Sequence, residues 1–167
     1  LGIQMEVHSL KPLFVPDEDR VILRQWIHNK GIQNGHRIVV IHPGSGERGK
    51  TRRWPEENFI ALTNLVLENS DSTVIFCGSE MEKNLTDSIC RIVSSDRAMS
   101  VAGELSIRTL AALLCQTDLF IGNDTGPMHL AAAMGTPTIG LFGPETPVRY
   151  GPFGDKNIDF YGSVPCS

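Results

Sequence analysis

The chain has 167 residues, of which 41% are hydrophobic and 20% are charged, and this size and composition predict one globular domain with its own hydrophobic core. The same proportions exclude a disordered chain, a collagen-like chain and a small disulfide-rich protein. The 15 Lys and Arg residues against 19 Asp and Glu residues give a net charge of −4, so a nucleic-acid-binding protein, which is usually basic, is not expected.

Residues 1–16 contain three turn-forming residues and no hydrophobic period, which predicts a linker ahead of a domain that spans 17–167. The chain begins at Leu1 without a signal-peptide pattern, and we expect it to be a piece of a longer, cytoplasmic protein. Its longest apolar runs, such as 38–41, are far shorter than the ~18 residues of a membrane span. At most a peripheral contact with the inner membrane is therefore expected.

From residue 17 onward the chain alternates helix signals with strand signals. Apolar residues three and four positions apart predict helices, and short runs of β-branched and apolar residues predict strands. In chain order these elements are a helix at 17–30, a strand at 37–41, a helix from 55, a strand at 73–77, a helix after Gly78, a strand at 99–102, a helix at 106–116, a strand at 119–121, a helix at 127–134 and a last strand at 138–142. The alternation predicts an α/β fold with an open parallel sheet and helices on both faces.

Four cysteines stand at positions 77, 90, 115 and 166. No two of them form a C-x-x-C pair, so neither a zinc site nor a redox motif is expected. Cys77, Cys90 and Cys115 lie among apolar residues, where free thiols behave as small hydrophobic side chains, and we expect them to be buried. Cys166, in the C-terminal tail, has no role in this interpretation. The pattern favours a reduced protein without a bound metal.

The loops that follow the predicted strands are rich in glycine. Right-handed crossovers place the carboxyl ends of parallel strands at one edge of the sheet, where open α/β sheets bind their ligands. Four of the five loops combine glycine with a Ser or Thr; the five are 42–46, 78–82, 103–105, 123–127 and 143–147. Tight turns alone would also use glycine. Exposed N–H groups and hydroxyls repeated along one edge favour a phosphate site.

The segment 44–51 fits two nucleotide-binding patterns, G-x-x-x-x-G-K-T and G-x-G-x-x-G. Both patterns require a helix that begins within the motif. Pro55 follows Thr51 by four residues, and a proline inside a helix costs about 3 kcal/mol and disfavours helical backbone at the preceding Trp54. We therefore expect the helix to begin near Pro55. A P-loop phosphotransferase stays open as the weaker alternative, and a dinucleotide-dependent oxidoreductase is weaker still.

The same loop carries four basic side chains within six residues, at Arg48, Lys50, Arg52 and Arg53. A run of charges is usually a solvated surface. This run lies at the expected ligand edge and leads into a helix N-terminus, so we expect at least one of the four to contact phosphate.

A second ligand loop is predicted at 123–129, where a strand passes into a helix. Thr125 suits the N-cap and Pro127 the first helical turn, which leaves the N–H groups of Thr125 and Gly126 to an anion at the positive end of the helix. His129, one turn further on, is either structural or a donor to phosphate. In the loop after the second strand, Glu82 is either a partner for ribose hydroxyls or an exposed acid in the first turn of a helix.

Taken together, four segments resemble the C-terminal half of family 9 glycosyltransferases, the ADP-heptose:lipopolysaccharide heptosyltransferases. The segments are HPGSG at 42–46, RRWP at 52–55 followed by Phe59, DTGPMHL at 124–130 and GLFGP at 140–144. Their order and spacing agree with the family from about Leu10 to the end of the chain. The resemblance implies one half of a GT-B enzyme of two Rossmann-like domains, namely the domain that binds the nucleotide sugar. The N-terminal acceptor domain of such an enzyme is expected to be absent from this chain.

The resemblance also implies roles for individual residues. Ser45, Gly46 and a basic residue before Trp54 would contact the diphosphate. The family has a lysine two residues before that tryptophan, where this chain has Arg52, so either Arg52 or Lys50 would take the role. The other implied roles are ribose binding by Glu82, an adenine contact by Leu105, a sugar contact by Asp124, N–H donation to phosphate by Thr125 and Gly126, and support of that loop by His129.

In the family, heptose passes by direct displacement with inversion to the inner core of lipopolysaccharide. The general base is an aspartate of the absent domain, so this chain is implied to bind the donor, ADP-heptose, without a catalytic residue, cofactor or metal of its own. The acceptor would bind through the absent domain, and the chain alone is expected to be inactive. A non-catalytic nucleotide-binding module remains a third alternative.

Overall fold

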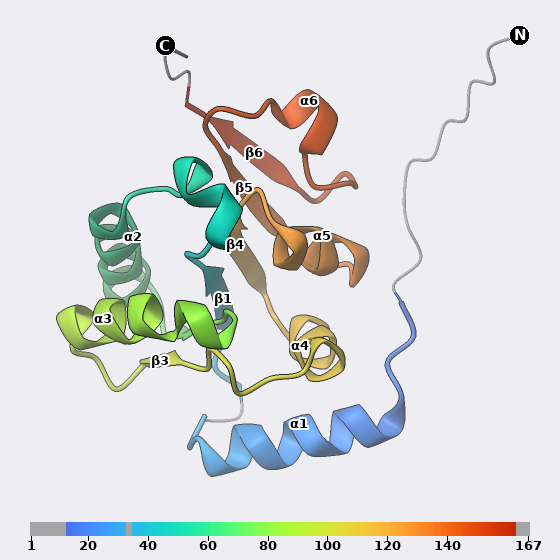
Figure 1. The fold of residues 1–167 in the computed structure, drawn as a ribbon. Helices are drawn as coiled ribbons and strands as arrows, with labels where there is room; N and C mark the ends of the chain where they lie inside the picture. Colours follow the sequence, from blue (N-terminus) through green and yellow to red (C-terminus); the bar gives the residue numbers. More distant parts are fainter. Residues whose placement is uncertain (1–12, 33–34, 163–167) are drawn as a thin grey trace, which may run out of the picture.

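The computed structural model describes residues 13–32 and 35–162, with the side chains at 47 and 48 left out, and its core is one six-stranded sheet (Figure 1). All strand pairs are parallel, in the order β3-β2-β1-β4-β5-β6. The strands are β1 (Ile38–His42), β2 (Thr73–Phe76), β3 (Ala98–Ser100), β4 (Leu119–Asn123), β5 (Thr138–Phe142) and β6 (Ile158–Tyr161). The predicted α/β fold with an open parallel sheet is confirmed.

Helices connect the strands. The α-helices are α1 (Asp17–Asn29), α2 (Glu56–Asn69), α3 (Lys83–Val93), α4 (Ile107–Leu114), α5 (Gly126–Ala133) and α6 (Pro147–Tyr150), and two short 3-10 helices are η1 (Glu47–Arg52) and η2 (Glu80–Glu82). Pro55 precedes α2 directly, so the predicted helix start is confirmed and the Gly-Lys-Thr of the P-loop-like segment does not open an α-helix. No helix in the described part of the chain is long and apolar enough to span a membrane.

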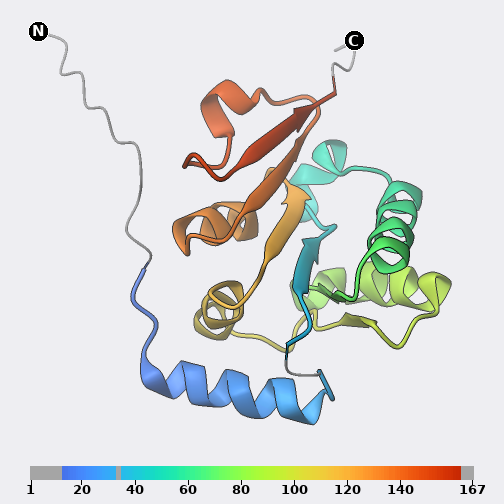
Figure 2. The ribbon, with the colours of Figure 1, turned by 180° about the vertical axis from the view of Figure 1, so that it is seen from behind.

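The sheet separates two hydrophobic cores because successive side chains of a strand point to opposite faces. Val40 and Phe120 face the core that α1, α4 and α5 complete, whereas Val39 and Ile121 face the core of α2 and α3. Figure 1 shows α2 and α3 on one side of the strands and α4 and α5 on the other, and Figure 2 gives the reverse view. Helices therefore cover both faces, as the alternation predicts.

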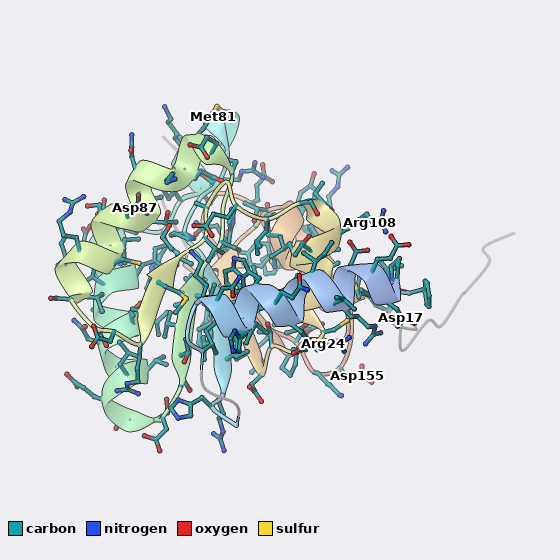
Figure 3. The ribbon with its side chains drawn as sticks, turned by 90° about the horizontal axis from the view of Figure 1, so that it is seen from below. Asp17, Arg24, Met81, Asp87, Arg108 and Asp155 are labelled. Atoms are coloured by element: carbon teal, nitrogen blue, oxygen red, sulfur yellow. The ribbon has the colours of Figure 1, made fainter. Side chains whose placement is uncertain are left out.

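Helix α1 is attached to the domain by specific contacts with α4 and by the residues that precede it. Arg108 Nη2 of α4 lies 2.8 Å from Asp19 Oδ2, and Figure 3 shows Arg108 close to the beginning of α1. Val15 is buried in the core beside α1, and the Leu13 N–H donates to the Ala133 carbonyl over 3.3 Å. Residues 1–12 of the predicted linker lie outside the described residues, and its described end packs onto the domain.

Strand β6 corrects the prediction that 138–142 is the last strand. It extends the sheet beyond β5, with Leu141 paired to Phe160, and all four of its residues are exposed. An exposed edge strand lacks the buried apolar run by which the other strands are recognised, so no pattern indicates it. The remaining predicted boundaries differ by a few residues, and β4 continues past Ile121 to the two residues that begin the ligand loop.

The cysteines differ in burial. Cys77 is buried, and burial raises the pKa of its thiol to about 12. Cys90 is half-buried, and burial likewise raises its pKa, to about 11. The prediction that Cys115 is buried is wrong, because this residue ends α4 on the side that faces solvent. Cys166 lies outside the described residues.

Candidate functional site

A cleft of about 740 Å³ opens at the carboxyl ends of β1, β2 and β4. Strand β1 lies between β2 and β4, so the strands that follow β1 are added first on one side of it and then on the other. Ligands of open α/β folds bind at such a switch point in the strand order. Nine of the ten predicted donor-site residues line the cleft: Ser45, Gly46, Arg52, Glu82, Leu105, Asp124, Thr125, Gly126 and His129. Lys50 is the exception, because it lies exposed on η1 and the described lining of the cleft does not include it.

The loop after β1 closes around the carboxylate of Glu82. Glu82 Oε1 accepts from the Gly46 N–H over 3.1 Å, and Oε2 accepts from the N–H and the hydroxyl of Ser79 over 2.9 and 2.8 Å. A Cβ at Gly44 would overlap this carboxylate, which is why the loop needs glycine there. The alternative of an exposed helix acid is wrong, since Glu82 is only 8% exposed.

Glu82 is ionised in this setting. The His42 ring holds the pKa of the Glu82 carboxyl far below its usual range, helped by the N–H groups of Ser79 and Gly46 and against the opposing effect of burial. His42 Nε2 lies 3.5 Å from Glu82 Oε2, and the His42 side chain is itself buried. The predicted contact of Glu82 with ribose stays a prediction, and the structure adds that this carboxylate organises two loops.

Asn123, the last residue of β4, connects the two ligand loops. It is fully buried, and its Nδ2 donates to the carbonyls of Pro43 and Gly44, each over 3.0 Å. Its Oδ1 accepts from the Trp54 N–H over 2.9 Å. The sequence does not predict this role, because the residues next to Asn123 do not indicate hydrogen-bond partners 69 to 80 positions away.

Arg52, Asp124 and His129 form a charged group on one wall of the cleft. Arg52 Nη1 lies 3.1 Å from Asp124 Oδ2, and His129 Nε2 lies 3.8 Å from Asp124 Oδ1. Asp124 is only 5% exposed, whereas Arg52 and His129 are partly open to the cleft. Since both oxygens of Asp124 face basic side chains, the cleft holds a guanidinium and an imidazole in fixed places, where each can also meet an anionic ligand.

Helix α5 begins at the same wall. Thr125 is its N-cap residue, as predicted, but the Thr125 hydroxyl does not cap the helix. This hydroxyl donates to the Asn123 carbonyl over 3.1 Å and lies 3.1 Å from His42 Nδ1. The first-turn N–H groups of a helix have no partners within it, and the helix dipole makes that end positive. Gly126 and Pro127 of this turn line the cleft.

The rest of the cleft combines an unpaired hydroxyl with an apolar wall. Ser45 Oγ is buried and has no hydrogen-bond partner among the described residues, although buried hydroxyls are normally paired. On the other side, the apolar residues Val101, Leu105, Ile107 and Leu110 line the cleft. Ile107 is 77% exposed, so its side chain is open to contact with a ligand in the cleft.

This fold and this cleft define a Rossmann-like α/β domain whose cleft lies at the ligand-binding edge of the sheet. Residues 22–167 match the sequence model of glycosyltransferase family 9 (heptosyltransferase), and the chain belongs to this family. The resemblance found in the sequence is thereby confirmed.

Individual relatives agree with this assignment. The chain is 30% identical over 141 residues to lipooligosaccharide heptosyltransferase 2 of Campylobacter jejuni, and the match covers 81% of this chain and 44% of the relative. It superimposes on a family 9 glycosyl transferase from Veillonella parvula with a TM-score of 0.84 and 23% identity, over 92% of this chain and 43% of that one. For the ADP-heptose lps heptosyltransferase II of E. coli, the TM-score is 0.78 and the identity 22%, over 89% and 44% of the two chains. The chain thus spans less than half the length of these proteins.

Proposed function

We propose that this domain binds the nucleotide-sugar donor of a family 9 glycosyltransferase, and that the donor is ADP-heptose. The observation that carries the proposal is the convergence in one cleft of the Arg52 guanidinium, the unpaired Ser45 hydroxyl and the N-terminal turn of α5. These are three kinds of group that bind phosphate oxygens. The E. coli relative named for ADP-heptose, which shares the fold, supports the choice of donor.

In the proposed complex the diphosphate lies between Arg52 and the beginning of α5. The nucleoside lies against Leu105 and Ile107, with its ribose toward Glu82, and the sugar lies toward Asp124. When the bond from the sugar to the diphosphate breaks, negative charge grows on the leaving phosphate. Donors that are already fixed in place stabilise this charge without the cost of reorganising solvent.

The full-length protein, on this proposal, transfers heptose to the inner core of lipopolysaccharide. On this proposal the general base and the acceptor site lie outside this chain, in a second domain like that of the family that the sequence resembles. This chain alone is therefore expected to bind the donor nucleotide without transferring sugar and without needing a metal or cofactor. Contact with the membrane, if the acceptor is lipid-linked, would be peripheral.

Calorimetric titration of the chain with ADP, UDP and GDP tests the proposal. We expect ADP to bind more tightly than the other two and to bind equally well with and without Mg²⁺, because the cleft offers basic side chains and N–H groups to the phosphates. Binding that requires Mg²⁺ and is tighter for triphosphates would contradict the proposal in favour of a P-loop phosphotransferase. A lack of binding to all three nucleotides would contradict a donor site in this chain.

Substitution of Arg52 decides which basic residue contacts the diphosphate. Arg52→Gln is expected to weaken ADP binding about 10- to 100-fold, the loss typical of a hydrogen bond to a charged group. Lys50→Gln is expected to change it less than about threefold, because Lys50 lies exposed outside the described lining of the cleft. Arg24→Gln, on the exposed surface of α1, is the matched control for loss of a positive charge. A larger effect at Lys50 than at Arg52 would reverse the assignment.

A further inference from the structure

His42 lies between the two sides of the cleft and contacts both. It is the last residue of β1, the strand that separates β2 from β4, and it is 3% exposed. Its Nε2 lies 3.5 Å from Glu82 Oε2, on the side where the proposed function puts the ribose. Its Nδ1 lies 3.1 Å from Thr125 Oγ1, at the beginning of α5, where the same proposal puts the phosphates.

The ring's contacts assign the proton of Nε2. Thr125 Oγ1 lies 3.1 Å from both the Asn123 carbonyl and His42 Nδ1, and a hydroxyl both donates and accepts, so this contact suits Nδ1 with or without a proton. On the opposite side, Nε2 faces an ionised carboxylate, which can only accept. An unprotonated Nε2 would direct its lone pair at the negative oxygen of Glu82. The contact with Glu82 therefore requires a proton on Nε2.

We propose that His42 is a positioning residue of the donor site, whose ring holds Glu82 through Nε2 on one side of the cleft and Thr125 through Nδ1 on the other. This inference rests on the proposed function for its effect on nucleotide binding. Glu82 in turn fixes the Gly46 N–H, and Thr125 opens the helix whose first turn lines the cleft. The ring thus joins the loops after β1, β2 and β4 into one rigid binding surface before any ligand arrives, which reduces the ordering that binding requires.

The protonation state is tested by NMR of the histidine ring nitrogens in ¹⁵N-labelled chain without nucleotide. The signals that disappear in His42→Gln belong to His42, and His28, exposed on α1, provides an internal reference. We expect the Nε2 of His42 to have a shift of the protonated type. A shift of the unprotonated type at Nε2 would overturn the assignment. This measurement is independent of whether the chain binds nucleotides.

The positioning role is tested by ADP calorimetry on two amide variants. His42→Asn keeps a donor near the place of Nδ1, and His42→Gln keeps one near the place of Nε2, so each variant retains only one of the two contacts. We expect each to bind ADP about tenfold more weakly, as for the loss of one buried hydrogen bond. His28→Gln is expected to bind like the unmodified chain. If packing alone mattered, the variant nearer in size would restore binding.

Thr125→Val provides a second test that leaves the buried ring in place. It removes the oxygen that contacts Nδ1 while it keeps the Thr125 N–H. The loss of affinity in the double variant with His42→Gln should be smaller than the product of the two separate losses, because both changes break the same connection. If the unmodified chain binds ADP and these variants bind equally well, the positioning role is wrong. If the unmodified chain does not bind ADP, the proposed function fails, and the NMR result still decides whether Nε2 of His42 carries the proton.

Discussion

Replacement of Asn123 by Asp is expected to lower the free energy of unfolding by about 4 kcal/mol. The new carboxylate would have no proton to donate to the Pro43 and Gly44 carbonyls, and it would place a negative charge beside both of them. Two buried acceptors lose their partner, and a new charged group must be desolvated at a site with no exposure. The Trp54 N–H keeps an acceptor, which limits the loss.

Urea unfolding at neutral pH measures this loss, and the exposed Asn84 of α3 offers the same substitution as a control. Asn84→Asp is expected to change the free energy of unfolding by less than about 0.5 kcal/mol. Equal effects at the two positions would mean that the Asn123 amide does not hold the ligand loops. Because these loops carry Ser45 and Trp54, Asn123→Asp should also abolish ADP binding under conditions in which the variant is still folded.

Replacement of Glu82 by Gln is expected to lower the free energy of unfolding by about 3 kcal/mol at neutral pH. Gln has almost the same shape, but its NH₂ group must face either the Gly46 N–H or the Ser79 and His42 donors. On whichever side the NH₂ group lies, it faces another donor, and neither of the two has an acceptor there. The exposed Glu57 of α2 provides the control, for which Glu57→Gln should have little effect.

The effect of Glu82→Gln depends on pH in a defined direction. The pKa of Glu82 is lowered in the folded protein from an ordinary value of 4.5, so in acid the unfolded chain takes up a proton that the folded chain does not. The contribution of Glu82 is therefore complete above about pH 4.5 and declines as the pH falls toward the folded pKa. Urea unfolding between about pH 7 and pH 3 should show the difference between the two proteins shrinking in acid. A difference that stays constant down to pH 3 would mean that Glu82 is not ionised in the folded protein.

The sequence predicts the parts of this molecule whose causes are local. Buried strands such as β1 and β2 are apolar runs, and Pro55 alone is enough to predict where α2 begins. Parallel topology then predicts that the glycine-rich loops meet at one edge, and the cleft is found there. The family resemblance adds the individual residues, nine of which the structure brings together.

Features that depend on distant partners could not be predicted in this way. His42 and Asn123 stand in or next to recognised motifs, but their partners lie 40 to 83 positions away in the sequence. Whether Glu82 is exposed or buried depends on the space left by Gly44, a contact between two loops. The opposite error arises at Cys115, whose apolar neighbours in the sequence lie on the buried side of α4 while Cys115 itself does not.

Strand β6 has a consequence for the behaviour of the chain at high concentration. It is the last strand on its side of the described sheet, so its outer backbone N–H and C=O groups can pair with another strand. Ile158 and Phe160 are more than half exposed, and they form an apolar stripe along this edge. An edge of this kind is a template on which a second sheet can grow. Self-association of the isolated chain is therefore expected to begin at this edge of the sheet, on the far side of β5 from the donor cleft.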